Sequence, residues 1–207
     1  MFRAGYAGAV DVTPLPVVGA PCGIVLAAGA GTRYGGPKAL AADADGTPWL
    51  DRAVALLAAS GCDPVLVTVG AAAAEVARRI PAPGRAVLVP DWNDGLSASV
   101  RSALDAAAAT GAELAVIVPV DTPTLPAAAV ARVLGAAAEA AASALVQATV
   151  AGAPSHPVLI GRDHWAEVAA TVAGDRGAGP YLAAHGATFV ACDDLWDGRD
   201  IDERPAP

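Results

Sequence analysis

Residue types that mark secreted, membrane-spanning and nucleic-acid-binding proteins are scarce in this sequence. Cysteine occurs only three times, at Cys22, Cys62 and Cys192, and this wide spacing and odd number fit neither a disulfide framework nor a metal site. No stretch is long, apolar and uncharged enough to span a bilayer. Residues 1–22 contain three prolines and no continuous apolar run, so they make a poor signal peptide. We therefore expect a cytoplasmic protein that does not contact a membrane.

Positive charge is also scarce. The chain has 13 Lys and Arg residues against 21 Asp and Glu residues, a formal net charge of −8, which argues against nucleic acid as a partner. A polyanionic ligand would therefore need a local cluster of basic residues. Lysine is nearly absent, because all basic residues except Lys38 are arginine. The segment around Lys38 is therefore a candidate site for an anionic ligand.

Short apolar runs alternate with helical patterns along the chain. The length fits one domain, which we expect at residues 23–207 after a loose N-terminal extension, residues 1–22. The apolar runs predict strands at residues 24–28, 64–69, 85–89, 114–118, 144–150, 157–160 and 188–191. Helices are predicted at residues 48–59 with Thr47 as N-cap, at 72–79, from Ser97, and from Pro126 to an alanine-rich end within 136–144.

This alternation predicts the fold class and the place of a site. Strands that are apolar throughout argue for an α/β fold with a mostly parallel sheet covered by helices on both faces. In such sheets the ligand lies beyond the carboxyl ends of the strands. Gly29, Gly70, residues 91–95 and Asp121 all follow predicted strands. We therefore expect them to share one site.

Residues 23–40 hold the clearest sign of that site. The apolar run that ends at Ala28 leads into a loop with four glycines, and the loop carries Arg33 and Lys38. Glycine lets backbone N–H groups approach phosphate oxygens closely, and the two cations add charge. The loop lacks the sixth-position glycine of the dinucleotide fingerprint and the Gly-Lys-Ser/Thr of a P-loop. The pattern favours a nucleotide triphosphate loop, with a plain flexible connection as the alternative.

Residues 26–38, Leu-Ala-Ala-Gly-x-Gly-x-Arg-x-Gly-x-x-Lys, resemble the signature of the MobA-like nucleotidyltransferases, and in particular the molybdenum cofactor cytidylyltransferase branch. The resemblance extends to about residue 202. It implies a Rossmann-like three-layer sandwich of the nucleotide-diphospho-sugar transferase type, with the loop on the triphosphate. Ala28, where the guanylyl branch has glycine, is more like the cytidylyl branch. The nucleotide-binding residues that we predict are Leu26, Ala27, Ala28, Gly29, Gly31, Thr32, Arg33, Lys38, Gly70 and Ser99.

Carboxylates near the predicted sheet edge are candidate metal ligands. Asp121 follows the most apolar strand, where a carboxylate could hold Mg²⁺ at the phosphates, or could instead form an Asx turn or helix N-cap. The resemblance implies that Asp121 is a magnesium ligand. In Asp200-Ile201-Asp202 we favour Asp202 as the second ligand, with a solvated acidic tail as the alternative. The sequence after Asp202 departs from the family's pattern, so the family's closing helix should be missing or very short.

Three further stretches resemble the family. Residues 92–100 resemble a loop that lies near the base, and there we expect Ser97 to cap a helix and Ser99 to contact the nucleotide. His156, in Ser-His-Pro-Val, and Asp175, in Gly-Asp-Arg-Gly-Ala, match stretches on the acceptor side, which makes both candidate acceptor-binding residues. A lone histidine beside a strand is also commonly structural. Gly179 replaces the arginine that the family has after the second stretch.

Together these residues predict Mg²⁺-dependent transfer of a nucleoside monophosphate, by resemblance CMP from CTP, to a phosphorylated acceptor, by resemblance molybdopterin or the molybdenum cofactor. Asp121 would hold the metal, and Arg33 and Lys38 would stabilise charge. An anionic phosphate nucleophile needs no general base. The alternatives are transfer of guanylate or another nucleotide, a different phosphorylated acceptor, a nucleotide-dependent oxidoreductase, and a non-catalytic nucleotide-binding partner of a molybdoenzyme.

Overall fold

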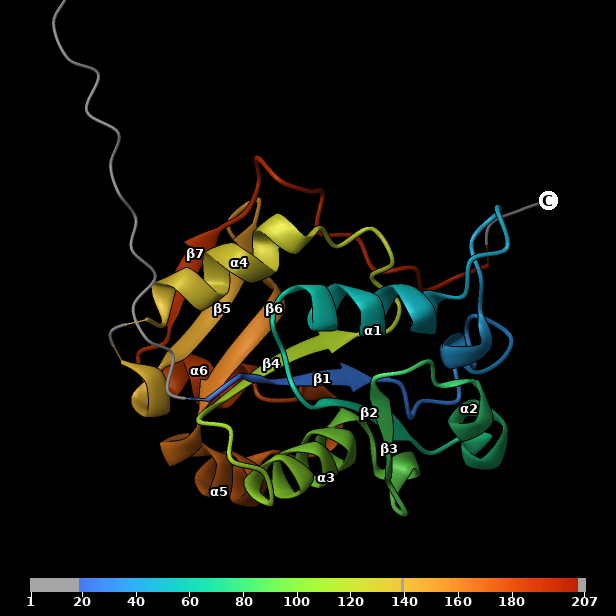
Figure 1. Ribbon diagram of the computed structural model, residues 1–207, viewed down its shortest axis with the longest axis horizontal. Coiled ribbons are helices and arrows are strands. Elements are labelled where there is room, and N and C mark those ends of the chain that lie inside the picture. Colours follow the sequence, from blue (N-terminus) through green and yellow to red (C-terminus); the bar gives the residue numbers. More distant parts are fainter. Residues whose placement is uncertain (1–18, 139, 205–207) are drawn as a thin grey trace, which may run out of the picture.

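A seven-stranded sheet runs through the middle of the protein (Figure 1). The computed structural model describes residues 19–138 and 140–204. The strands are β1 (Cys22–Leu26), β2 (Val65–Val69), β3 (Gly84–Leu88), β4 (Leu114–Pro119), β5 (Leu145–Val150), β6 (Ala153–Gly161) and β7 (Thr188–Ala191). The helices are α1 (Trp49–Ala59), α2 (Ala73–Arg79), α3 (Leu96–Ala108), α4 (Ala127–Ala136), α5 (Arg162–Thr171) and α6 (Gly179–Ala184), with 3-10 turns η1 (Lys38–Leu40), η2 (Trp92–Asp94), η3 (Ala141–Ser143) and η4 (Gly174–Arg176).

The sheet is mostly parallel, with one reversed strand. Its order is β3-β2-β1-β4-β6-β5-β7, and only β6 pairs antiparallel with its neighbours. The reversal comes from a two-residue turn, Ala151 and Gly152, whose φ angles of 50° and 74° suit a tight hairpin between β5 and β6. The beginning of β6 therefore lies at the same edge of the sheet as the ends of β1 and β4. This edge carries the candidate site.

Helices cover both faces of the sheet, as the alternation of strands and helices predicts (Figure 1). Within each strand, successive side chains point to opposite faces, so that Val65 and Val67 join one apolar core and Leu66 joins the other. The first core packs beneath α1 and α4, and the second beneath α3, α5 and α6. The α/β class and the mostly parallel sheet are confirmed. Within the described residues, no helix has the length and apolar character needed to cross a bilayer.

Helix starts were the least predictable feature. α1 begins with Pro48 at its N-cap and no side-chain cap, so Thr47 does not cap it. α3 begins one residue before Ser97, which is buried inside the first turn, and Gly95 is the N-cap. The predicted capping roles of both hydroxyls are therefore wrong. Helices α5 and α6 were not predicted, because α5 mixes charged and apolar residues around its circumference and α6 has only six residues.

The structure can be compared with what the sequence predicts for the N-terminal extension and for the segment after β7. β1 begins at Cys22, two residues before the predicted strand, and most of the proposed extension, residues 1–18, lies outside the described residues. After β7 the described residues, up to residue 204, form no further helix. This final segment instead returns across the sheet edge, where the N–H of Ile201 donates to the carbonyl of Asp121 at 2.9 Å.

Candidate functional site

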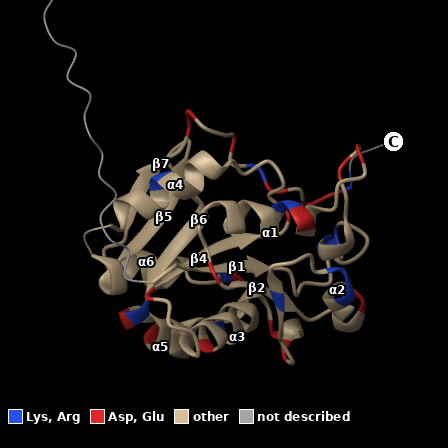
Figure 2. Ribbon diagram, in the orientation of Figure 1, with Lys and Arg blue, Asp and Glu red and all other residues tan. Residues whose placement is uncertain are grey.

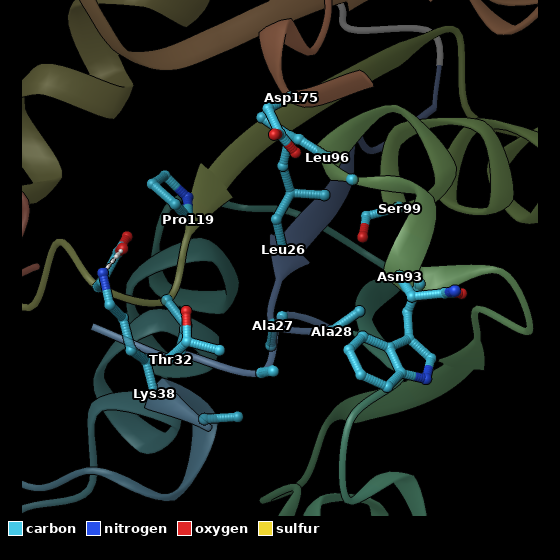
Figure 3. A pocket seen from close by; sticks show the side chains of 18 residues that line it. Leu26, Ala27, Ala28, Thr32, Lys38, Asn93, Leu96, Ser99, Pro119 and Asp175 are labelled. Carbon is cyan, nitrogen blue, oxygen red and sulfur yellow. Dashed lines mark hydrogen bonds and ion pairs between the residues drawn. The ribbon is translucent and has the colours of Figure 1, made fainter. Parts of the chain in front are cut away.

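A cavity of about 440 Å³ opens at the carboxyl ends of β1 and β4 (Figure 3). This volume is within the range of small-molecule sites. Its walls come from the loop after β1, from η1, from η2 and the start of α3, from the end of β4 and from η4. The lining residues are Leu26, Ala27, Ala28, Gly29, Ala30, Gly31, Thr32, Lys38, Ala39, Trp92, Asn93, Gly95, Leu96, Ser99, Pro119, Val120, Asp121 and Asp175.

The glycine loop that follows β1 folds back on itself at Gly31. The carbonyl of Gly31 accepts hydrogen bonds from the N–H groups of Gly35, at 2.9 Å, and of Gly36, at 3.1 Å. Gly31 has a φ of +59°, and a Cβ at this position would overlap the carbonyl oxygen of Gly36. Only glycine fits here for both reasons. The closed loop places Gly29, Gly31 and Thr32 on the cavity wall, and their contact with a nucleotide stays a prediction.

Two anchors hold this loop to the fold. At its start, the buried hydroxyl of Thr68 in β2 accepts a hydrogen bond from the N–H of Ala27 at 2.9 Å and donates to the carbonyl of Val25 at 3.3 Å. Farther along, the buried ring of Tyr34 packs against Trp49 with the ring centroids 5.3 Å apart. The position of the loop is therefore set by β2 and α1. The sequence did not predict the anchoring role of Thr68, because this residue lies inside an apolar strand and belongs to no recognisable motif.

The charged residues of the site form a compact network. The Lys38 ammonium donates to Oδ2 of Asp121 and to Oδ1 of Asp202, each at 2.8 Å, and Arg33 Nη1 lies 2.8 Å from the other oxygen of Asp202. The side chains of Lys38 and Asp121 are 14% and 18% exposed, whereas that of Arg33 is 73% exposed. In Figure 3 Lys38 points along the cavity wall toward the end of β4. Lys38 and Asp121 are therefore the sheltered centre of the network.

This network perturbs two pKa values. Burial by itself lowers the pKa of Lys38, but the hydrogen bonds to Asp121 and Asp202 outweigh it and leave the pKa raised. The hydrogen bond from Lys38, with further help from Arg33, lowers the pKa of Asp202. Both groups are therefore charged at neutral pH. Asp121 does not cap a helix, since α4 begins at Ala127 with Pro126 as its N-cap.

The carboxylates of Asp121, Asp200 and Asp202 form an acidic triad. One oxygen from each lies within 4.8 Å of the others. Ile201 lies between Asp200 and Asp202 in the chain, and its N–H donates to the carbonyl of Asp121. This hydrogen bond holds both C-terminal aspartates at the sheet edge. Three hard oxygen donors suit Mg²⁺ or Mn²⁺, and the ammonium of Lys38 already lies between two of them. The residues therefore fit a divalent cation. Sequence reasoning chose Asp202 over Asp200, whereas the geometry brings both to the triad.

Uncharged residues from η2 and α3 form the opposite end of the cavity. Asn93 and Ser99 lie across the cavity from Lys38, on the side of Ala28 (Figure 3), and Trp92, next to Asn93 in η2, also lines the cavity. Of these, only Ser99 was predicted as a site residue. Gly70 does not line the cavity: a Cβ there would overlap the Trp92 side chain, and the neighbouring Ala71 N–H donates to the Ala28 carbonyl. Gly70 therefore adjoins Trp92 and not the cavity itself, so the structure does not place it where the predicted nucleotide contact would need it.

The two predicted acceptor-binding residues lie at different places. Asp175 lines the cavity, and its Oδ1 lies against Gly95, so that η4 closes over the start of α3. His156 is not among the lining residues. Its Nδ1 is buried without a hydrogen-bond partner, and burial lowers its pKa, while Asp121 and Asp200 partly oppose that shift. His156 lies near the start of β6. Because β6 runs antiparallel to β4, with Val158 paired to Ile117, this start lies at the carboxyl end of β4, near Asp121.

The distribution of charge agrees with this division of the site. Figure 2 shows acidic and basic residues scattered over the loops and helices, while the strands carry almost none. Within the cavity lining, charge is confined to Lys38, Asp121 and Asp175. A ligand that fills the cavity would therefore meet a charged end at Lys38 and Asp121. At the other end it would meet the uncharged Trp92 and Ser99, with the carboxylate of Asp175 against the start of α3.

Two known proteins have sequences similar to this chain. The chain is 37% identical over 193 residues to nicotine blue oxidoreductase of Paenarthrobacter nicotinovorans, which covers 88% of this chain and 93% of that protein. It is 33% identical over 147 residues to a molybdenum cofactor guanylyltransferase of Rhodobacter capsulatus, covering 69% of this chain and 64% of that protein.

Among solved structures, Rv0371c of Mycobacterium tuberculosis H37Rv superposes with a TM-score of 0.74 at 28% identity, covering 89% of this chain and 93% of that one. The same protein is also known as a complex with manganese, with a TM-score of 0.68, 26% identity, and coverage of 84% and 88%. A CMP:2-keto-3-deoxy-manno-octonic acid synthetase complexed with CTP, at 13% identity and a TM-score of 0.64, covers 89% and 94% and shares the fold. Residues 23–189 match the MobA-like NTP transferase domain, and this chain belongs to that family.

Proposed function

We propose that this protein is a nucleotidyltransferase that moves a nucleoside monophosphate from a nucleoside triphosphate to a phosphorylated acceptor. One observation carries the proposal: the closed glycine loop, Lys38 and the acidic triad meet at one end of a cavity of about 440 Å³. Backbone N–H groups of the loop and a sheltered ammonium are suited to a polyphosphate. The uncharged Trp92 and Ser99 at the other end suit a nucleoside.

The reaction needs positioning more than covalent chemistry. A phosphate oxygen of the acceptor attacks the α-phosphorus, and the bond from that phosphorus to the oxygen bridging to the β-phosphate breaks as pyrophosphate leaves. The glycine loop would orient the triphosphate, and Lys38 and Arg33 would neutralise charge on it. The acceptor phosphate is already anionic at neutral pH, so no side chain must remove a proton from it.

Asp121 and Asp202, with Asp200 beside them, would hold Mg²⁺. When bound, the metal supplies charge neutralisation at the phosphates, which lowers the cost of the developing negative charge. The manganese complex of Rv0371c supports a divalent cation in this fold. The chain's own contribution is the rigid placement of three carboxylates by β4 and the C-terminal segment.

CTP is the nucleotide that we favour, and molybdopterin or the molybdenum cofactor is the acceptor. The basis is the Leu-Ala-Ala-Gly start of the loop, in which Ala28 is buried on the cavity wall, together with the guanylyltransferase relative that acts on the molybdenum cofactor. On the acceptor side, Asp175 would accept hydrogen bonds from the acceptor. His156 would lie beneath it near the triad. A molybdoenzyme that receives the product is the partner that this chemistry implies.

Pyrophosphate release tests the proposal. The purified protein is incubated with CTP, GTP, ATP or UTP and Mg²⁺, with and without molybdopterin or its molybdenum form. We expect release with CTP that depends on the acceptor. We expect Lys38→Ala to lower turnover at least about a hundredfold, from loss of a charged contact made to the phosphates. Arg79→Ala is the matched control, because it removes a cation from an exposed ion pair with Glu75 outside the cavity.

The outcomes separate the claims. Release with another nucleotide would retain the reaction class and contradict the choice of CTP. A rise in melting temperature with CTP but no pyrophosphate release with any acceptor would indicate a non-catalytic nucleotide-binding protein. Neither binding nor release would contradict the proposal. Turnover of Lys38→Ala within a few-fold of the wild type would contradict the role of that lysine.

A second candidate is an oxidoreductase, favoured by the 37% identity to nicotine blue oxidoreductase over 88% of this chain. The same loop and Lys38 could hold the pyrophosphate of a nicotinamide dinucleotide, although the loop lacks the sixth-position glycine of the usual fingerprint. NADH and NADPH are offered to the protein with a quinonoid dye as electron acceptor, and absorbance at the nicotinamide band is followed. Dye-dependent oxidation without pyrophosphate release would favour this function over the first.

A further inference from the structure

The ammonium of Lys38 lies between two members of the acidic triad. Its distances to Asp121 Oδ2 and Asp202 Oδ1 are both 2.8 Å, so two of its three N–H donors are used by these carboxylates. Asp121 and Asp202 are also two of the three residues whose oxygens lie within 4.8 Å of one another. In this arrangement the charge of Lys38 is paired with two carboxylates and is not free to act on a ligand in the cavity.

A divalent cation held by the triad would lie beside the ammonium while Lys38 stays in place. Mg²⁺ approaches carboxylate oxygens to about 2.1 Å, which would bring the metal close to a group of like charge that is bound to two of the same carboxylates. Lys38 is only 14% exposed, so little solvent screens that repulsion. Arg33 contacts Asp202 from outside and is 73% exposed, so it competes much less.

We propose that Lys38 is a built-in competitor of the divalent cation and exchanges its carboxylate partners for the nucleotide's phosphates when the nucleotide binds. The inference rests on the proposed nucleotide site. Without nucleotide, Lys38 neutralises the triad and keeps its affinity for metal low. With nucleotide, the phosphates take Lys38, and the freed carboxylates accept the metal. The two ligands are therefore coupled, each strengthening the binding of the other.

Coupling of this kind is reciprocal and has a signature in the nucleotide-free protein. Removing the charge at position 38 should raise the affinity for metal in the absence of nucleotide, although it removes a group that the reaction uses. A residue that only supports the metal site would have the opposite effect. Typical couplings between sites span roughly 5- to 150-fold, so we expect an increase of about tenfold or more.

The experiment measures Mn²⁺ binding to the full chain by the electron paramagnetic resonance signal of free Mn²⁺, without nucleotide. Lys38→Met removes the charge and retains most of the side-chain volume, and Lys38→Gln is a second neutral variant. Lys38→Arg retains the charge and is the matched control. Asp121→Asn verifies that the binding belongs to the triad, and circular dichroism verifies the fold of each variant.

We expect Lys38→Met and Lys38→Gln to bind Mn²⁺ about tenfold or more tightly than the wild type, and Lys38→Arg to bind it no more tightly. Equal or weaker binding by folded neutral variants would overturn the inference, and so would tightening that survives Asp121→Asn. Because no nucleotide is turned over, this outcome is distinguishable from failure of the proposed function: a protein without pyrophosphate release could still show the tightening, and an active transferase could lack it.

Discussion

Gly31→Ala is the substitution that most directly tests whether the closed glycine loop makes the site. Its φ of +59° costs an alanine roughly 1–2 kcal/mol, and the added Cβ overlaps the Gly36 carbonyl oxygen. Relief of that overlap requires the loop to open, which breaks the two hydrogen bonds accepted by the Gly31 carbonyl, each contributing about 1 kcal/mol. A nucleotide that needs the closed loop would have to restore this strain and overlap, which cost at least about 1–2 kcal/mol and correspond to roughly a tenfold or greater loss of nucleotide affinity.

Isothermal titration calorimetry with CTP and Mg²⁺ measures this loss, and urea denaturation measures stability. Gly186→Ala is the matched control, because Gly186 has a similar φ of +68°, has nothing within 4 Å of an added Cβ, and lies between α6 and β7 away from the cavity. It should lose about 1–2 kcal/mol of stability and bind CTP normally. Binding by Gly31→Ala within threefold of the wild type would refute the reasoning, and so would an equal loss of affinity in Gly186→Ala.

Three further predictions concern buried side chains of the fold. Thr68→Val leaves the Ala27 N–H buried without an acceptor, so the free energy of unfolding should fall by about 1–3 kcal/mol in urea denaturation, and a change under about 0.5 kcal/mol would contradict the anchoring role. Burial raises the pKa values of Cys22 and Cys62 to about 12, so both thiols should resist iodoacetamide at pH 8 until the protein unfolds. Since these pKa values are raised on folding, their contribution to stability is complete below about pH 9 and is lost as the pH rises toward 12; constant stability across that interval would show the burial to be wrong. Burial lowers the pKa of His156, so ¹⁵N chemical shifts should show its imidazole becoming protonated at a lower pH than an exposed histidine does, and protonation at or above the ordinary histidine pKa would contradict its environment.

The local parts of the account were accessible from the sequence. The loop at residues 26–38 carries its own pattern of glycines and cations, and the structure places its predicted residues along the cavity, apart from Arg33, which pairs with Asp202 outside the lining. Asp121 could be located because it closely follows the most apolar strand. The α/β class followed from alternating strands and helices. Each of these inferences depends on residues that are neighbours in the chain.

The remainder depends on contacts between distant segments. Lys38 is separated by 83 residues from Asp121 and by 164 from Asp202, and no pattern in the sequence indicates that a cation predicted for phosphates is held by carboxylates. The reversal of β6, which brings His156 to the sheet edge, depends on a two-residue turn that the sequence analysis did not identify. Thr68 likewise bonds to Val25 and Ala27, which lie 43 and 41 positions earlier in the chain.

The transfer of an α-labelled nucleotide tests the central claim most directly. CTP labelled with ³²P at either the α or the γ position is incubated with the protein, Mg²⁺ and molybdopterin, and the products are separated. The account predicts that α-label appears in the acceptor product and γ-label in pyrophosphate, with both lost in Lys38→Ala. Transfer of γ-label to the acceptor, or oxidation of NADPH with no transfer of either label, would contradict it.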